Sequence, residues 1–410
     1  MLKNLISSFF TKSFVAFISL AILLVSSRYL GGAVVGQVSL FVLNLAIIQI
    51  VNDIYTGTAL VYFIPKHNLG KIYSKGFVWT IGCIVVLNLI FFIFNTGIKE
   101  LWLHVLTISF LSTLHAFHNV ILLAKEKIKT YNFLILFQPA LLLGVLVLDV
   151  FVFDLKDVNA YLVSAYVSWC ISLSLSSFYV IKILKKSSRT EEIINSTAIF
   201  KNGFISQLGN LAHTLSNRYN YYMIASTVLI GVYASASSLV ESIWIISGSV
   251  SPIILTHIAN QTDMENNSRI TLLLSKICFL LSILCVAVLF VIPADFFTWL
   301  LGKDFSGTKT IMLYLSPGIL CISFSTIISH YFSGLGMQKV QLIANSLGLL
   351  VTLSTSYYFI NLYGLKGACY SATLSYFMQT LVVTIVFMKM NKFKIHQLLN
   401  FRKDLELLKK

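Results

Sequence analysis

The stretch Ser216-Asn217-Arg218-Tyr219-Asn220-Tyr221-Tyr222 lies near the middle of the chain and begins a long apolar run. No charged residue follows Arg218 until Glu241. Such a run predicts a helix that crosses a membrane. An arginine at that depth costs about 2.5–3.5 kcal/mol on insertion scales, so we expect Arg218 to face a protein interior or a water-filled cavity.

The rest of the chain has the same apolar character. Of its 410 residues, 57% are hydrophobic and 11% are charged, whereas about 25% of the residues of a soluble domain are charged. Apolar runs of about 20 residues recur from end to end, which predicts an all-α integral membrane protein without a separate soluble domain. Twelve transmembrane helices are expected, over residues 10–30, 35–63, 76–97, 101–123, 131–152, 159–182, 203–226, 228–256, 271–293, 309–334, 340–361 and 366–388.

Basic residues are distributed unevenly between the predicted loops. If the N-terminus is cytoplasmic, the outer side contains only Arg28, Lys99, Lys156, Lys303, Lys309 and Lys366. All other lysines and arginines except Arg218 then fall on the inner side, with Lys276 counted at an inner loop. By the positive-inside rule, this asymmetry predicts that both termini are cytoplasmic. It also explains the net charge of +15 without a nucleic-acid partner.

The two ends of the chain have basic residues beside apolar ones. Lys3 and Lys12 precede an apolar run without a cleavage site, which predicts a first membrane helix and not a removed signal. The tail over 391–410 combines leucines with lysines and arginines. It is either a basic amphipathic helix on the inner leaflet or a solvated, frayed end.

The chain shows signs of internal duplication. Val35–Ser39 begins the second predicted helix and Ile230–Ala234 begins the eighth, while Leu123–Ile128 follows the fourth and Leu335–Val340 follows the tenth. Two halves of six helices each have the same orientation in the membrane, as in parallel repeats that enclose a site and alternate access to it. We therefore predict two pseudo-symmetric six-helix bundles, over 1–190 and 191–390, followed by the cytoplasmic tail over 391–410.

Polar residues of the second predicted helix recur at helical spacing. Gln49, Asn52, Asp53 and Thr56 share one face. A buried carboxylate such as Asp53 is costly unless it is paired or hydrated. These residues either line a polar cavity or connect neighbouring helices near the inner mouth.

The seventh predicted helix carries a broader polar face. Asn210, His213, Asn217 and Asn220 form one stripe, and Thr214, Arg218 and Tyr221 form the next. Polar side chains in membrane helices often only connect helices by hydrogen bonds. The arginine among them favours a cavity lining.

Two further charged residues belong to this hypothesis. Glu241 in the eighth predicted helix is a candidate partner for Arg218 or a candidate ligand for a coupling ion. Arg28 ends the first helix and either snorkels to the outer interface or points into the cavity mouth. His115 and His118 in the fourth helix either pack against other helices or bind protons or substrate.

Metal, redox and hydrolytic chemistry find no support in the sequence. The six cysteines lie in apolar runs and form no CxxC pair, so we expect buried thiols. No glycine-rich nucleotide loop, no HExxH and no Ser/His/Asp set in an ordered loop is present. We therefore expect no cofactor, no metal, no catalytic residue and no enzyme activity.

Several short segments carry a family resemblance through their order along the chain. They are Ser27–Gly31 with Gly36, Asn217–Asn220 with Gly231–Ala234, Pro252, Leu301-Gly302 with Phe305, and Leu362–Ala368. In this order they resemble the polysaccharide-transport branch of the multidrug/oligosaccharidyl-lipid/polysaccharide exporter superfamily, and more narrowly the Wzx-type O-antigen flippases. Many relatives carry an aspartate in helix seven where Asn220 stands here, so ion coupling at that position does not follow.

The resemblance implies a pair of six-helix bundles around a cationic cavity. The implied substrate is an undecaprenyl-diphosphate-linked oligosaccharide of the O-antigen or capsule type, which moves from the inner to the outer leaflet during polysaccharide or lipopolysaccharide biosynthesis. Membrane lipids and other polysaccharide-assembly proteins would be partners. The protein would lie in the cell membrane, which is the inner membrane in a Gram-negative host.

The residue roles expected under this hypothesis divide into three groups. Arg28 and Arg218 bind the diphosphate, as a clamp with one arginine from each bundle, because guanidinium groups form paired hydrogen bonds with phosphate. Sugar contacts fall to Asn217, Asn220, Tyr221, Asn52 and Gln49, and ion coupling to Asp53 or Glu241. A multidrug/cation antiporter of the same superfamily is the alternative, and a membrane polysaccharide polymerase is a third candidate that the short outer loops disfavour.

Overall fold

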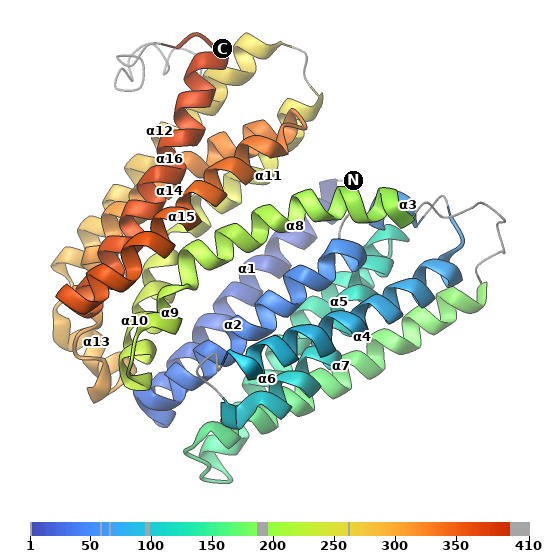
Figure 1. Ribbon diagram of the computed structural model, residues 1–410, viewed down its shortest axis with the longest axis horizontal. Helices are drawn as coiled ribbons and strands as arrows, with labels where there is room; N and C mark the ends of the chain where they lie inside the picture. Colours follow the sequence, from blue (N-terminus) through green and yellow to red (C-terminus); the bar gives the residue numbers. More distant parts are fainter. Residues whose placement is uncertain are drawn as a thin grey trace. The chain divides into compact units, whose positions relative to one another are not determined.

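The computed structural model describes residues 2–57, 60–64, 67–94, 99–186, 196–260 and 263–393 (Figure 1). Within these ranges every regular element is a helix. The predicted amphipathic tail lies almost wholly outside the described residues. The elements are α1 (Leu2–Val25), η1 (Ser26–Leu30), α2 (Gly31–Thr56), α3 (Leu60–Phe63), α4 (Leu69–Ile93), η2 (Lys99–Leu101), α5 (Trp102–Ala124), α6 (Ile128–Phe151), α7 (Val158–Lys186), α8 (Ser196–Arg218), α9 (Asn220–Met223), α10 (Thr227–Glu241), α11 (Trp244–Asn260), α12 (Met264–Val291), α13 (Ala294–Leu301), η3 (Lys303–Phe305), α14 (Thr308–Gly334), α15 (Gln338–Tyr363) and α16 (Leu365–Met390).

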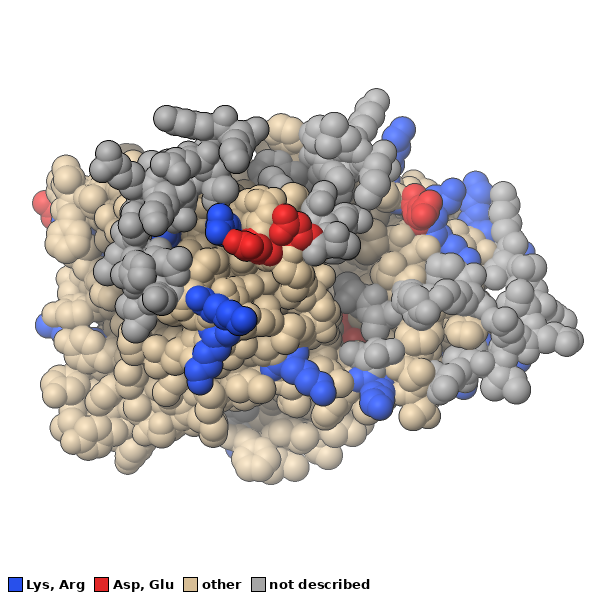
Figure 2. All heavy atoms as spheres, turned by 90° about the horizontal axis from the view of Figure 1, so that it is seen from above, with Lys and Arg blue, Asp and Glu red and all other residues tan. Residues whose placement is uncertain are grey.

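Nine helical segments in the described part of the chain are long and apolar enough to cross a membrane. The first, Phe10–Thr56, has 47 residues and would extend about 70 Å as one straight helix, about twice the thickness of a bilayer core. It divides at Gly31, whose φ of 83° favours glycine, so that α1 and α2 are separate helices. The chain is therefore a multi-pass, all-helical membrane protein, and the sparse charges on the face drawn in Figure 2 agree with this.

Three of the twelve predicted segments differ in form from the expectation. The segment over 35–63 is divided, because α2 ends at Thr56 and the short α3 begins at Leu60. The segment over 228–256 is not one helix, because α10 ends at Glu241 and α11 begins at Trp244. The segment over 203–226 is also interrupted, because α8 ends at Arg218 and the short α9 follows. The count of twelve spans and the cytoplasmic termini stay predictions.

The chain forms two compact units. Unit 1 comprises Met1–Leu211 and Ser226–Gly231, and unit 2 comprises Ala212–Ala225 and Val232–Lys410. The chain changes unit three times: within α8, between α9 and α10, and within α10. The predicted pseudo-symmetric bundles, divided at residue 190, stay a prediction.

Two buried histidines connect helices of unit 1. His115 Nδ1 lies 3.2 Å from the carbonyl oxygen of Ser172, and His115 Nε2 lies 2.9 Å from the amide nitrogen of Asn119. Because a carbonyl only accepts hydrogen bonds, Nδ1 carries the proton, and Nε2 accepts from the amide. His118 Nδ1 lies 3.0 Å from Ser176 Oγ. This network between α5 and α7 favours a packing role over substrate binding.

The core of unit 2 forms where α11, α12, α14 and α16 meet. Tyr331, Phe332 and Phe387 are almost fully buried there, and the rings of Tyr331 and Phe387 meet edge to face with centroids 5.1 Å apart. Lys276 is also buried in this unit, with 2% of its surface exposed. Its assignment to an inner loop is therefore wrong, because α12 extends over Met264–Val291 and places it about 18 Å from the helix start. Arg218 is thus not the only basic residue that unit 2 shields from solvent.

Small residues bring α2 and α10 into backbone contact within unit 1. Gly32 and Gly36 of α2 face Thr227 and Gly231 of α10, so both helices present a small residue at i and i+4. A Cβ added to Gly36 would lie 1.9 Å from the Thr227 carbonyl oxygen, and one added to Gly231 would lie 2.1 Å from that of Gly32. Helices in membranes pack closely in this way where side chains are absent. Gly36 and Gly231 are also the positions that the sequence repeat matches.

Replacing Gly36 by alanine should therefore destabilise the protein. The methyl group must push α10 away, so we expect the free energy of unfolding to fall by about 1–3 kcal/mol, measured by thermal unfolding in detergent. Gly82→Ala is the matched control in α4, because its Cβ would meet no atom within 4 Å. It should not lower the unfolding temperature and should raise it slightly, since alanine is the better helix former. Equal unfolding temperatures for the two variants would contradict the close contact.

Candidate functional site

Two interrupted helices position an arginine and a glutamate in unit 2. The chain leaves α8 at Arg218, forms the single turn of α9, and then becomes extended at Ile224. Likewise, α10 ends at Glu241, and α11 begins three residues later at Trp244. Helices that break inside a membrane are tolerated where their freed backbone groups lie in protein or beside a polar cavity.

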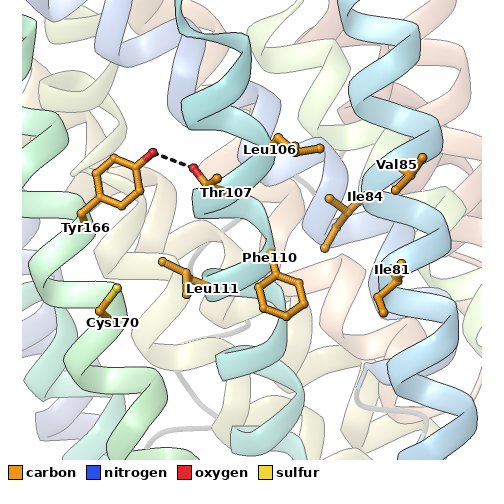
Figure 3. A pocket seen from close by; sticks show the side chains of 9 residues that line it. All are labelled: Ile81, Ile84, Val85, Leu106, Thr107, Phe110, Leu111, Tyr166 and Cys170. Carbon is orange, nitrogen blue, oxygen red and sulfur yellow. Dashed lines mark hydrogen bonds between the residues drawn. The ribbon is translucent and has the colours of Figure 1, made fainter.

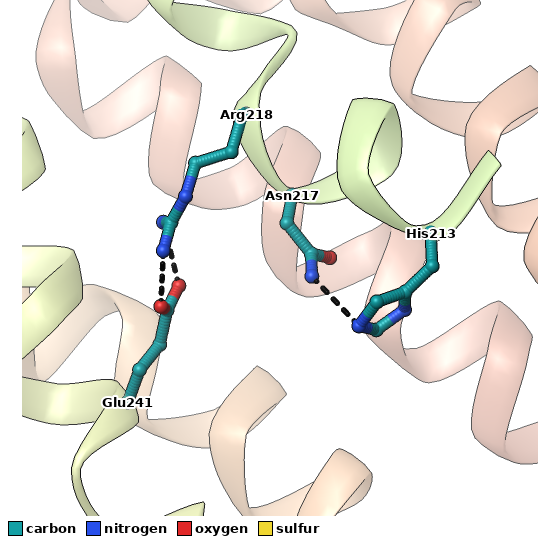
Figure 4. A network of polar contacts seen from close by, with 4 residues as sticks. All are labelled: His213, Asn217, Arg218 and Glu241. Carbon is teal, nitrogen blue, oxygen red and sulfur yellow. Dashed lines mark hydrogen bonds and ion pairs between the residues drawn. The ribbon is translucent and has the colours of Figure 1, made fainter. Parts of the chain in front are cut away.

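Arg218 and Glu241 form a two-pronged ion pair (Figure 4). Arg218 Nη1 donates to Glu241 Oε1 over 2.7 Å, and Nη2 donates to Oε2. Glu241 ends its helix, where the helix dipole disfavours a negative charge, so the guanidinium offsets an unfavourable position. Exposed fractions of 24% for the arginine side chain and 13% for the glutamate leave both groups within reach of a ligand.

Aromatic and polar side chains surround the pair. The ring of Tyr221 lies 5.5 Å from Arg218 Cζ, within the range of a cation–π contact. Asn217 directly precedes Arg218, and its amide nitrogen lies 3.1 Å from Nε2 of His213, one turn earlier in α8. The His213 ring lies 6.4 Å from that of Trp244.

Two buried polar atoms of this group have no hydrogen-bond partner in the described part of the chain. They are Oδ1 of Asn217, an acceptor, and Nε1 of Trp244, a donor. A buried polar atom without a partner costs about 1–3 kcal/mol, so such atoms need an explanation. A ligand rich in hydroxyl groups would satisfy both.

Asn220, the second asparagine of the opening stretch, holds a different position. It is fully buried, its amide nitrogen donates to the Ala368 carbonyl oxygen over 3.0 Å, and its Oδ1 accepts from Ser356 Oγ over 2.7 Å. These bonds connect α9 to α15 and α16. A sugar contact by Asn220 stays a prediction, and it would require these bonds to break.

The candidate residues of unit 1 form pairs along α2. Gln49 Nε2 donates to Asp53 Oδ1 over 2.7 Å, and Asn52 Nδ2 donates to Thr56 Oγ1 over 2.8 Å. Gln49 and Asp53 are half-buried, whereas Asn52 is fully buried and its carbonyl oxygen accepts from Trp79 Nε1. The single predicted face is therefore two adjacent stripes.

Arg28 lies in η1 of unit 1 and is exposed, between the buried Ser27 and Leu30. The structure thus brings Arg218, Glu241, Asn217 and Tyr221 together in unit 2. It holds Gln49, Asn52, Asp53 and Arg28 in unit 1. Their expected roles stay predictions.

Trp244 and Tyr376 were not among the sequence-based candidates. The Trp244 ring lies between those of His213 and Tyr376, and its centroid is 6.0 Å from that of the tyrosine. The only available signal was the position of Trp244 three residues after Glu241, on the same helical face if the helix had continued.

Solved structures with this fold are membrane transporters. The lipid II flippase MurJ in an inward closed conformation is 15% identical, covers 100% of this chain and 92% of its own, and superposes with a TM-score of 0.77. An inward-facing multidrug resistance MATE family transporter of the MOP superfamily is 15% identical over 92% of this chain and 94% of its own, with a TM-score of 0.65. The MATE transporter VcmN of Vibrio cholerae gives 15% identity over 95% of this chain and 92% of its own, with a TM-score of 0.57. No family sequence model and no curated protein sequence matches the chain.

The hydrogen bonds of Asn220 lead to a stability prediction. Asn220→Ala leaves the Ala368 carbonyl oxygen and the Ser356 hydroxyl without this partner, so the free energy of unfolding should fall by about 1–3 kcal/mol. Asn210→Ala in the preceding helix α8 is the control, because Asn210 is exposed and its loss should cost less than about 0.5 kcal/mol. Thermal unfolding of both variants in detergent checks this, and equal stabilities would remove Asn220 from the packing of unit 2.

Proposed function

We propose that this protein is a flippase. It moves an undecaprenyl-diphosphate-linked oligosaccharide repeat unit, of the O-antigen or capsule type, from the inner to the outer leaflet of the cell membrane by alternating access. The protein acts as a transporter and not as an enzyme. The observation that carries the proposal is the accessible, two-pronged Arg218–Glu241 pair at two interrupted helices.

The chemistry of the pair suits a diphosphate. A carboxylate and a phosphate both present two oxygen atoms to the fork of a guanidinium group. Arg218 can therefore exchange Glu241 for the diphosphate without a change in the geometry of its hydrogen bonds. This exchange keeps the arginine paired throughout, and it avoids the cost of an isolated charge within the membrane.

The surrounding residues suit the sugar portion. Asn217 Oδ1 and Trp244 Nε1 supply one acceptor and one donor without present partners among the described residues. The half-buried Trp244 presents an aromatic surface to the apolar face of a sugar ring. Tyr221 is buried beside Arg218, so its contact with a sugar would require the site to open. Glu241, once released by Arg218, becomes available to a proton or another cation, which would couple the exchange to an ion gradient.

The comparisons favour a lipid-linked substrate. The TM-score with the lipid II flippase MurJ is 0.77, against 0.65 and 0.57 for the MATE transporters compared above. A multidrug/cation antiporter is the second candidate, since those transporters share the fold. A drug-susceptibility screen of a deletion strain distinguishes the two, because only the antiporter predicts sensitisation to cationic drugs.

Loss of Arg218 tests the proposal directly. Arg218→Ala should lower transport of a fluorescent lipid-linked oligosaccharide in proteoliposomes at least about 100-fold, because two charge-assisted hydrogen bonds to phosphate are lost. Arg218→Lys keeps the charge but loses the fork, so it should fall between the wild type and the alanine variant. Full transport by Arg218→Ala, with the protein inserted and folded, would falsify the proposal.

Glu241 should compete with the substrate for Arg218. Glu241→Gln weakens the pair, so we expect tighter binding of undecaprenyl diphosphate, by about tenfold, together with slower transport. Binding to the purified variant in detergent and transport in proteoliposomes measure the two effects. Weaker binding by this variant would mean that the glutamate supports the phosphate site and does not compete for it.

A further inference from the structure

Polar side chains that border a cavity of this protein can satisfy one another, as the apolar groove lined by α4, α5 and α7 of unit 1 shows (Figure 3). The hydroxyl oxygens of Thr107 and Tyr166 lie 2.6 Å apart there. The pair of Asn217 and His213 in unit 2 is different. The Asn217 amide nitrogen bonds His213, whereas the oxygen of the same amide is buried without a partner among the described residues. Half of this amide is therefore unused.

The hydrogen bonds of His213 define its protonation state (Figure 4). Asn217 Nδ2 can only donate, so His213 Nε2 accepts and carries no proton. The ring then carries its proton on Nδ1, which is the donor for the hydrogen bond between His213 and Gln379 of α16. Gln379 Nε2 donates to Ser375 Oγ over 3.3 Å, so Gln379 Oε1 remains as the acceptor. His213 is therefore neutral in this arrangement.

Charged and titratable groups surround this imidazole on several helices of unit 2. Arg218, later in α8, opposes a second positive charge, and Glu241 at the end of α10 offsets the arginine through the ion pair. Tyr221 of α9 lies beside Arg218. The ring of Trp244 in α11 lies 6.4 Å from the imidazole, and Tyr376 of α16 lies on the other side of that indole. The Arg218–Glu241 pair thus makes a further proton on the imidazole less costly than an unpaired arginine would.

We propose that His213 and Asn217 form a proton-operated switch within the site of the proposed function, on which this inference rests. A proton from water that binds the lone pair of Nε2 breaks the hydrogen bond from Asn217, because two N–H donors then face each other. The Asn217 amide turns over, so that its Oδ1 accepts from Nε2–H. The amide nitrogen takes the place of the unpartnered oxygen. The switch satisfies the buried acceptor and offers an incoming anion N–H donors where an acceptor had been.

This switch couples proton uptake to the binding of a diphosphate. In the proposed exchange, the diphosphate replaces Glu241 at Arg218 and brings negative charge close to His213. A protonated His213 and a donating Asn217 amide both favour that anion, whereas neutral His213 with an accepting Asn217 oxygen does not. Linkage is reciprocal, so a proton strengthens diphosphate binding by the same factor by which the diphosphate strengthens proton binding.

Tryptophan fluorescence of the full-length protein in detergent tests the switch without any ligand. A protonated imidazole quenches a nearby indole, and Trp244 is the reporter for His213. Emission from the wild type should fall in one step as the pH is lowered from about 8 to about 5. His213→Gln and Trp244→Phe should each lack this step. Thermal unfolding of each variant at both pH values shows that it is folded.

Asn217→Asp tests the part that the amide plays in this step. Its carboxylate can only accept, so it favours protonated His213 and should move the step to higher pH by about one unit. A step that is absent from the wild type, that persists in His213→Gln, or that stays at the same pH in Asn217→Asp overturns the switch.

Binding of undecaprenyl diphosphate separates the switch from the proposed function. The wild type should bind it at least about fivefold more tightly at a pH of about 6 than at about 8, after correction by the same ratio in His213→Gln, which contains the ionisation of the lipid itself. Asn217→Ala should have the ratio of His213→Gln. A wild-type ratio in Asn217→Ala overturns the amide switch, because the charge of His213 then acts alone. If the lipid binds at neither pH, the proposed function fails, and the fluorescence step alone decides the switch.

Discussion

Backbone N–H and C=O groups that lie away from water need hydrogen-bond partners within the protein, and this requirement governs the structure. In a bilayer, an unbroken helix meets the requirement within its own chain. The long helices of both units follow from it, and so do the places where helices stop. The two interruptions beside Arg218 and Glu241 occur where side chains and neighbouring helices provide an environment for freed backbone groups. The ion pair is therefore part of how the chain accommodates two helix ends, and it is also the chemical centre of the candidate site.

Polar side chains inside this protein fall into two groups that the sequence does not separate. Asn220 and His115 are hydrogen-bonded on all sides and connect helices. Asn217 and Trp244 retain buried polar atoms without partners among the described residues. The first arrangement gives packing strength, whereas the second leaves capacity for a ligand. Asn217 and Asn220 have the same side chain and lie only three positions apart, so only their contacts distinguish them.

Close helix packing was visible in the sequence only as a possible repeat. Gly36 and Gly231 were matched because similar residues surround them, and the structure shows that they lie against each other within unit 1. The sequence motif thus has a steric reason, because neither position has room for a Cβ atom. Lys276 shows the opposite case, since the positive-inside count assigned it to a loop although α12 buries it. Charge counting treats a lysine near a predicted helix end as a loop residue, and it has no information on the neighbouring helices that cover it.

The sequence by itself determined that the chain is helical and lies in a membrane, because apolar runs of sufficient length leave no other way to satisfy the backbone. It also identified Arg218 as a residue that needs a polar partner, since hydrocarbon cannot solvate its charge. Only the tertiary structure decided that Glu241 is that partner and that Asn220 belongs to the packing. It also decided that α8 and α10 each contribute residues to both units. Those outcomes depend on where each helix breaks and on which side chains meet across the break, and periodicity along a single chain carries no information about either.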